Sequence, residues 1–314
     1  MAALTYLCWR RVEEAEMDVL VSGSSGLVGS ALVSALGDEG HQVRRLTRSG
    51  SSSPEGGVRW DPSSGMIDAA GLEGVDAVVH LAGENIVGRW TAAKKARIRD
   101  SRVEGTRLLS GALAQLSTPP GVMICASATG YYGDRGNELL TEESAPGHNF
   151  LAGVCQEWEA AADPAREAGV RVVHMRFGIV LSTEGGALAT TLPIFKLGGG
   201  GRIGSGRQYQ SWIALDDVTG AILHALSTDS LSGPVNATVP DPPTNIEYTK
   251  TLGRVLGRPT VFPLPAPVAR LVLGEVADEL LLASQRIEPV RLKETGYDFR
   301  YPELEGAFRH LLGR

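Results

Sequence analysis

The sequence predicts an α/β fold built on a doubly wound parallel sheet. A glycine-rich turn joins an apolar strand to an amphipathic helix near the N-terminus, and further apolar strands alternate with helical patterns along the chain. The 314 residues, 43% of them apolar, are enough for one large α/β domain or two smaller ones.

The first sixteen residues, MAALTYLCWRRVEEAE, precede the first expected strand. Their arginines follow a short apolar patch and their glutamates come last, which is the wrong order for a secretory signal and too acidic for a transit peptide. We expect residues 1–16 to form a tail, with Met17 directly before the first strand, and a cytoplasmic protein as the default.

The stretch VLVSGSSGLVG predicts a strand, a tight turn and the start of a helix. The apolar run at 19–21 is typical of a strand buried on both faces. Gly23 allows the turn, Gly26 lets a pyrophosphate approach the backbone, and Gly29 lets the helix lie close to the strand. The amino end of the helix, with about half a positive charge, favours a phosphate there. No Walker lysine follows, so the turn is not a P-loop.

The next segments complete a strand–helix–strand unit. An apolar helical stripe follows the turn, and HQVRRLTRS supplies a second strand. This context favours dinucleotide binding over an ordinary glycine-bearing turn. The contacts expected in the turn are Gly23, Ser25, Gly26, Leu27 and Val28.

The end of the second strand indicates which dinucleotide binds. NAD sites place an Asp or Glu here for the ribose 2′-hydroxyl, and this sequence has none. The strand ends in Thr47, Arg48 and Ser49, whose guanidinium and hydroxyls suit a 2′-phosphate. The sequence therefore predicts NADP(H). The alternative is that Arg48 is only a solvated loop charge.

Charge and composition point to small-molecule partners. The net charge of -6 and pI near 5.6 argue against a nucleic-acid or anionic-membrane surface. Cys8, Cys125 and Cys155 have no C-x-x-C spacing, and the six histidines are scattered, so we expect no disulfide scaffold and no metal. No apolar run reaches the roughly 18 residues that span a bilayer.

Two more strands are expected to end at the ligand-binding edge of the sheet. VDAVVHLAGEN ends in Leu81, Ala82 and Gly83, which allow a cofactor to lie against the backbone. A polar helix is expected over about 91–116. GVMICASATGYYG then opens into a small-residue loop. Its polar side chains are Ser127, Thr129, Tyr131 and Tyr132.

From Met17 onward the chain resembles the extended short-chain dehydrogenase/reductase superfamily, in its epimerase-like branch with a C-terminal domain of unknown function. The resemblance rests on the glycine turn followed by HLAGENI, SATGYYG, RFGIVLSTEGGAL, GGRIGSGRQYQSWIALDDV and NATVPDPPTN. It implies an NADP-binding Rossmann domain at 17–181. A smaller mixed α/β substrate lobe would occupy mainly 182–314, with elements returning to the Rossmann domain.

The resemblance also implies cofactor contacts from Thr47, Arg48, Leu81, Ala82 and Arg102. Arg102 is otherwise an exposed helix charge. Helices beside the sheet commonly pair subunits in this superfamily, so a homodimer is possible.

The usual chemistry of this superfamily needs a tyrosine and a lysine four residues later, since the cation lowers the pKa of the phenol. No tyrosine in this chain has a lysine at that spacing. Aligning HNFLAGVCQEWEAAA places Phe150 and Val154 at the two positions, and the usual serine position falls on Ala128. Cofactor binding and catalysis must therefore be judged separately.

A proton carrier, if there is one, must come from elsewhere. Tyr131 is the first candidate, with Ser127 beside it as a second catalytic residue and Tyr132 as an alternative to Tyr131. Both rings would otherwise only pack or line the pocket. Glu142 and Glu143 are expected to be solvated in a polar loop.

Residues 182–212 predict a long glycine-rich loop, typical of a lid. Its Arg202 and Arg207 either wrap an anionic substrate or belong to a flexible connector. Asp216 and Asp217 precede an apolar helix, where an Asp cap accounts for at least one of them.

Later segments predict two further helices, one capped by Asn245 and one at about 302–312. Relatives often have histidine where Ala214 stands, so this chain lacks another polar side chain at that position.

Two functions follow from these observations. The first is an NADP(H)-dependent epimerase-like oxidoreductase acting on a small carbonyl or sugar-like substrate. The second is a non-catalytic NADP(H)-binding redox sensor or regulatory protein. The absent Tyr–Lys pair favours the sensor, whereas the retained pocket and substrate lobe favour the enzyme, which we prefer.

Overall fold

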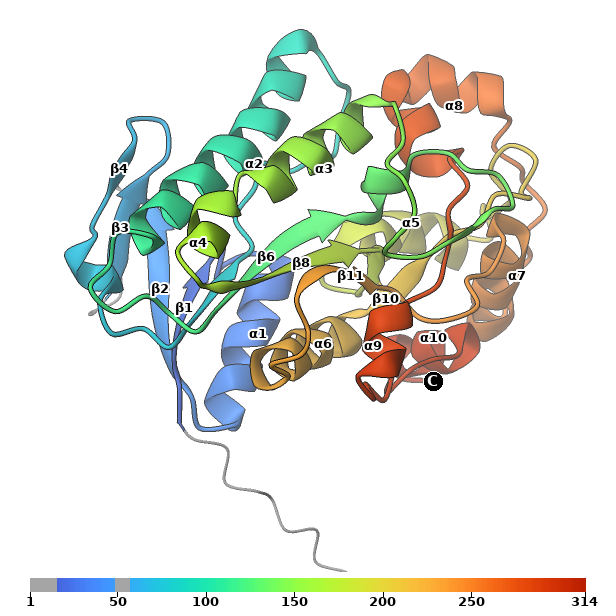
Figure 1. Ribbon diagram of the computed structural model, residues 1–314. Helices are drawn as coiled ribbons and strands as arrows, with labels where there is room; N and C mark the ends of the chain where they lie inside the picture. Colours follow the sequence, from blue (N-terminus) through green and yellow to red (C-terminus); the bar gives the residue numbers. More distant parts are fainter. Residues whose placement is uncertain (1–15, 49–56) are drawn as a thin grey trace, which may run out of the picture.

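A central sheet with helices on both faces organises the computed structural model, which describes residues 16–48 and 57–314 (Figure 1). These residues form an eight-stranded sheet in the order β11-β8-β6-β5-β1-β2-β3-β4. All its neighbouring strands are parallel except β3 and β4. The structure therefore confirms the predicted α/β fold.

The strands of this sheet are β1 Asp18–Ser22, β2 Gln42–Arg48, β3 Val58–Asp61, β4 Met66–Ile67, β5 Ala77–His80, β6 Val122–Ala128, β8 Arg171–Phe177 and β11 Gly233–Ala237. Two small parallel pairs lie outside it: β9 Ile179–Leu181 with β10 Trp212–Ala214, and β7 Leu139–Leu140 with β12 Arg286–Ile287.

The longer helices are α1 Leu27–Asp38, α2 Ala92–Leu113, α3 Phe150–Ala160, α5 Gly186–Lys196, α6 Leu215–Ser227, α7 Asn245–Leu256, α8 Ala266–Leu273 and α10 Leu304–Leu312. Shorter ones are η1 Ala70–Leu72, η2 Thr129–Tyr132, α4 Asp163–Glu167, the π-helix η3 Ala277–Leu281 and α9 Val290–Glu294. None of the helices in this described part of the chain is long and apolar enough to cross a bilayer.

Alternating strand residues explain why both faces of the sheet are covered. Val19 and Val21 face the layer of α1 and α6, whereas Leu20 faces the layer of α2 and α4. All three side chains have no exposed surface. A strand buried on both sides needs a continuous apolar run, which is the pattern seen in the sequence.

A third apolar cluster forms the C-terminal lobe, toward which the strands β6 and β8 run in Figure 1. It packs α5, α7 and α10 around Trp212. The predicted loop at 182–212 is therefore wrong in part, because α5 occupies 186–196. Its buried residues Leu188, Leu192 and Phe195 have helical spacing, a signal that its glycine-rich surroundings obscured.

Two predicted helix caps are also wrong. Thr244, not Asn245, caps α7, in a capping box with Glu247. Neither Asp216 nor Asp217 caps α6, whose N-cap is Ala214 with no side-chain cap.

Asp217 instead holds the C-terminal segment against α6. It is fully buried and accepts hydrogen bonds from the Tyr297 hydroxyl at 3.1 Å and from the backbone N–H groups of Arg300 at 2.7 Å and Tyr301 at 3.0 Å.

Candidate functional site

The turn between β1 and α1 admits no side chain at two of its glycines. Gly23 has φ +68°, and a Cβ there would lie 2.9 Å from the backbone of Leu81 and Ala82. A Cβ on Gly29 would lie 2.1 Å from the carbonyl oxygen of Gly23. The ends of β1 and β5 and the first turn of α1 are therefore packed backbone against backbone.

A buried serine joins the carboxyl ends of β1 and β5. The Ser22 hydroxyl and His80 Nδ1 share a hydrogen bond of 2.6 Å, and Ser22 Oγ accepts from the N–H groups of Leu81 at 3.1 Å and Ala82 at 3.3 Å. Burial lowers the pKa of His80 to about 4, so its ring is neutral at pH 7. Sequence reasoning missed this pair, although a polar residue ends each of the two apolar strands.

The amino end of α1 is open to an anion. Gly26 is its N-cap, no side chain caps it, and no acidic residue lies in its first turn. Ser25 and Gly26 are exposed, and Leu27 and Val28 are half-buried. Its unbonded N–H groups suit a phosphate.

The start of α5 lies beside this helix end, since a Cβ on Gly185 would be 3.5 Å from the Leu27 side chain. No local sequence pattern indicates this contact.

Arg102 lies against the end of β5 rather than in solvent. Its Nη1 donates to the carbonyls of Glu84 at 3.0 Å and Ile98 at 3.1 Å. A Cβ on Gly83 would be 3.3 Å from the guanidinium carbon. Burial lowers the pKa of this guanidinium. Its alternative placement as an exposed helix charge is wrong.

Thr47 and Arg48 end β2, the strand beside β1. Thr47 Oγ1 donates to the Val58 carbonyl at 3.4 Å, and Arg48 is exposed opposite Trp60. Both residues thus lie at the sheet edge that carries the glycine turn. Ser49 lies outside the described residues.

Two of the predicted hydroxyls at the end of β6 are committed to buried partners. Ser127 donates to Glu159 Oε1 at 2.7 Å. Tyr132 donates to Asn236 Oδ1 at 2.7 Å and accepts from Arg176 Nη1 at 3.0 Å. Burial raises the pKa of Tyr132 to about 12, so it is a poor proton carrier at neutral pH.

Tyr131 differs from these two residues. It is half-buried, and its hydroxyl makes no hydrogen bond to any residue that the structure describes. The Arg176 guanidinium lies 3.5 Å from the centre of its ring. Ser127, Tyr131 and Tyr132 are therefore brought together, but with different freedom to bind a ligand.

Arg176 and Glu159 form a buried two-point ion pair, with Nε–Oε1 and Nη2–Oε2 both at 2.8 Å. Burial works against the charged guanidinium, but the hydrogen bonds that it donates to Glu159, and the charge of that carboxylate, hold the pKa of Arg176 above its ordinary value. Sequence reasoning missed both residues. An arginine within the apolar strand VRVVHMRF was the available signal, because a buried charge needs a partner.

The side chains at the two positions aligned with the missing Tyr–Lys pair have no ionisable group. The Phe150 ring packs edge-on against Trp90 at 5.3 Å, with Lys95 Nζ 4.3 Å from its centre. Val154 is buried. Proton transfer from these positions is chemically excluded.

Glu142 was expected to be solvated, and this is wrong. It is 5% exposed, and its Oε1 accepts from the N–H groups of Asn236 at 3.1 Å and Arg291 at 3.3 Å. Burial raises the pKa of this carboxyl. Glu143 is exposed, as expected, and pairs with Arg291 at 2.8 Å. Among the described residues, no three His, Cys, Asp or Glu side chains are grouped to hold a metal.

Comparisons with known proteins agree with this architecture. Residues 19–237 match the NAD dependent epimerase/dehydratase family, and residues 264–311 match a domain of unknown function, DUF1731. The chain is 45% identical over 297 residues to epimerase family protein MT2273 of Mycobacterium tuberculosis, covering 94% of this chain and 98% of that protein. It is 36% identical over 300 residues to human epimerase family protein SDR39U1, covering 94% and 100%.

The crystal structure of human SDR39U1 (isoform2) with NADPH superimposes with a TM-score of 0.86 at 34% identity, covering 95% of this chain and 100% of that one. The match spans both the sheet and the C-terminal lobe. The chain therefore belongs to the NAD-dependent epimerase/dehydratase family, with a C-terminal DUF1731 domain.

Proposed function

We propose that this protein is an NADP(H)-dependent oxidoreductase or epimerase acting on a small carbonyl or sugar-like substrate, with Tyr131 as its proton donor. One observation carries the proposal. Of the hydroxyls of Ser127, Thr129, Tyr131 and Tyr132, only those of Thr129 and Tyr131 lack a hydrogen-bond partner among the described residues, and Tyr131 is the more exposed of these two. It is thus available to a substrate oxygen at the edge where ligands bind in open α/β sheets.

The proposed cofactor is supported by the turn. The packed backbone at Gly23 and Gly29 and the uncapped amino end of α1 suit a pyrophosphate, and Arg48 suits a 2′-phosphate. The human relative was crystallised with NADPH. When bound, NADP(H) supplies or accepts a hydride at its nicotinamide ring.

Arg176 would serve as a positioning residue. A desolvated cation over an aromatic face is worth about 2 kcal/mol, which holds the Tyr131 ring in one orientation. Glu159 balances the charge of Arg176, and Ser127 donates to the same carboxylate. The cation that orients the tyrosine thus comes from β8 instead of from a lysine on the same helix.

A screen of carbonyl compounds, alcohols and sugars tests the proposal, with oxidoreduction followed by the absorbance of reduced nicotinamide and epimerisation, which regenerates the cofactor, followed by chromatographic separation of the sugar epimers. We expect Tyr131→Phe to lower kcat by at least about 100-fold, the usual contribution of a general acid. Tyr209→Phe, in the C-terminal lobe, is the matched control and should keep full turnover. Full turnover in Tyr131→Phe would show that another group carries the proton.

A non-catalytic NADP(H) sensor is the second candidate, and the apolar Phe150 and Val154 favour it. It predicts tight cofactor binding, no turnover with any compound in the screen, and amide hydrogen exchange that differs between the NADPH and NADP⁺ complexes. Turnover that persists through purification and is lost in Tyr131→Phe would contradict the sensor.

A further inference from the structure

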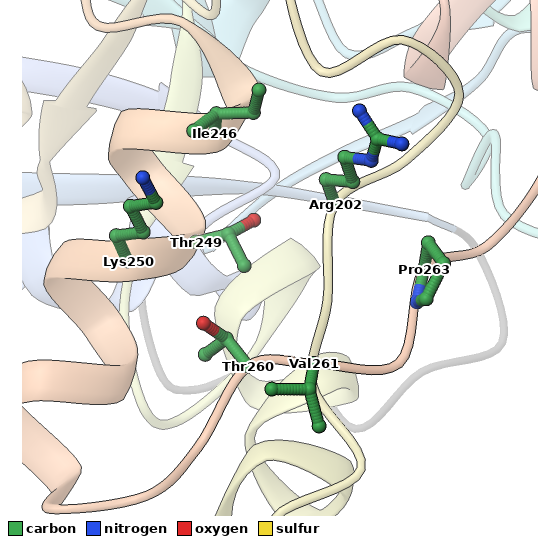
Figure 2. A pocket seen from close by; sticks show the side chains of 7 residues that line it. All are labelled: Arg202, Ile246, Thr249, Lys250, Thr260, Val261 and Pro263. Carbon is green, nitrogen blue, oxygen red and sulfur yellow. The ribbon is translucent and has the colours of Figure 1, made fainter.

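A pocket of about 300 Å³ lies in the C-terminal lobe, between α7, the loop that carries Arg202 and the segment before α8 (Figure 2). This volume is at the lower end of the range of small-molecule sites. None of its lining residues belongs to β1, β5 or β6, whose ends form the cofactor turn and the Tyr131 edge. The lining residues are Arg202, Ile246, Thr249, Lys250, Thr260, Val261 and Pro263.

The pocket carries two positive charges, and no Asp or Glu lines it. Arg202 comes from the glycine-rich loop and Lys250 from α7, and both are exposed. Their charged ends lie apart in Figure 2, and both side chains are long and flexible enough to turn toward one ligand in the pocket. Arg202 Nη1 has a long contact of 3.4 Å to the Ser205 carbonyl, which leaves its other N–H groups to a ligand.

Thr249 adds a hydroxyl to the lining of the pocket. Its side chain lies on α7 and the residue is 3% exposed, yet its hydroxyl has no hydrogen-bond partner in the described part of the chain. Figure 2 shows the hydroxyl oxygen on the side toward Arg202. The hydroxyl oxygen is not among the described side-chain atoms that are both fully buried and unpartnered, so it opens to the pocket and can bond what enters.

The opposite wall is held close to α7 by a glycine. A Cβ on Gly253 would lie 2.4 Å from Thr260 Cγ2 and 2.9 Å from the Arg258 carbonyl, so no other residue fits there. This contact fixes Thr260, a second hydroxyl, at the pocket. The remaining lining side chains, Ile246, Val261 and Pro263, are apolar.

We propose that this pocket binds the phosphate group of a small phosphomonoester. A phosphomonoester carries about -1.5 to -2 charge at pH 7, which matches the two cations, whereas a carboxylate would leave one cation unmatched. The threonine hydroxyls donate to phosphate oxygens, and the apolar side chains contact the carbon skeleton. The site is separate from the cofactor turn and does not depend on hydride transfer.

Calorimetric titration of the NADPH-saturated protein tests the proposal, because the cofactor then occupies the other phosphate-binding groups. We expect one equivalent of phenyl phosphate to bind more tightly than inorganic phosphate, and both more tightly than benzoate. Arg202→Gln/Lys250→Gln should weaken phenyl phosphate binding at least about tenfold, the value of one charge-assisted hydrogen bond. Arg207→Gln, on the same loop but outside the lining, should not.

Thr249→Val separates a ligand contact from a structural role. It keeps the shape of the side chain and removes only the hydroxyl, so phenyl phosphate should bind several-fold more weakly while Tm stays unchanged or rises. No binding to the NADPH-saturated protein, or equal binding to the double variant, would overturn the site. Equal affinity for inorganic phosphate and phenyl phosphate would overturn the ester as its ligand. A lower Tm with unchanged binding in Thr249→Val would overturn the role of Thr249.

Discussion

At the residue scale, the hydrogen bonds around Arg176 and Glu159 occupy the hydroxyls of Ser127 and Tyr132 and leave that of Tyr131 unbonded. A buried guanidinium is tolerated only when its N–H groups are hydrogen-bonded and its charge is balanced. Arg176 donates to Glu159, to the Tyr132 hydroxyl and to the Glu142 carbonyl, and the Glu159 carboxylate balances its charge. Ser127 and Tyr132 are hydrogen-bonded within this network, so their role is structural. Tyr131 contacts it only through the face of its ring.

Tyr132→Phe should lower the free energy of unfolding by about 1–3 kcal/mol, because Asn236 Oδ1 and Arg176 Nη1 each lose a buried partner. Tyr131→Phe is the control and should change it by less than about 0.5 kcal/mol. Urea unfolding of the two variants measures the difference. Equal losses in both would mean that the two hydroxyls are not distinguished as described.

Because the Glu142 carboxyl is buried, we expect the free energy of unfolding to depend on pH. Burial raises its folded-state pKa above the ordinary value of 4.5, so the folded protein binds this proton more tightly than the unfolded chain does. Its contribution to stability is therefore full below the unfolded pKa and is lost as the pH rises through the folded pKa. Glu142→Gln should be more stable than the native protein at neutral pH, and this advantage should shrink toward pH 4.5.

Urea unfolding from neutral pH down to the carboxyl range measures this advantage. Glu143→Gln, whose carboxylate is exposed, should show a small difference that does not depend on pH in this way. A Glu142→Gln variant that is less stable than the native protein by the same amount at every pH would contradict the assignment.

At the element scale, α3 shows how the C-terminal half shapes the site. Glu279, on η3, accepts from the N–H groups of Phe150 at 3.1 Å and Leu151 at 3.2 Å, and from Asn149 Nδ2 at 2.6 Å. It thus closes the amino end of the helix that would carry the usual Tyr–Lys pair. Phe150 and Leu151 then pack with Leu273 and Leu280 of the C-terminal half.

Glu279→Ala should therefore lower the free energy of unfolding by about 2 kcal/mol and speed amide exchange at Phe150 and Leu151. Glu275→Ala is the matched control, since it removes only an exposed pair with Lys95 and should cost less than about 1 kcal/mol. Hydrogen exchange with mass spectrometry locates the effect. Unchanged exchange at the start of α3 would rule out this capping role.

The sequence predicted which helices and strands form more accurately than it predicted where they begin and end. The polar helix expected at about 91–116 is found at Ala92–Leu113, with Thr91 as its cap. The caps predicted at Asn245 and at Asp216 or Asp217 were wrong because a capping residue type also suits other partners. Thr244 forms the capping box of α7, and Asp217 bonds Tyr297, 80 residues later. Long-range partners of this kind leave no local pattern.

At the scale of the whole molecule, the sheet was predictable because its central strands β1, β5 and β6 are buried on both faces and so are apolar runs. The glycine turn was predictable because Gly23 and Gly29 leave no room for a side chain. The network of Glu159, Arg176 and Asn236 was not, since three elements far apart in sequence bring it together. The pocket between Arg202 and Lys250 likewise depends on tertiary packing alone.

The central claim is that the turn after β1 and the end of β2 together hold NADP(H), with Arg48 binding the 2′-phosphate. Calorimetric titration of NADPH and NADH into the native protein, Arg48→Gln and the control Arg45→Gln tests it most directly. We predict that NADPH binds at least about tenfold more tightly than NADH, that Arg48→Gln removes most of this preference, and that Arg45→Gln keeps it. Equal affinity for the two dinucleotides in the native protein, or binding of neither, would contradict the account.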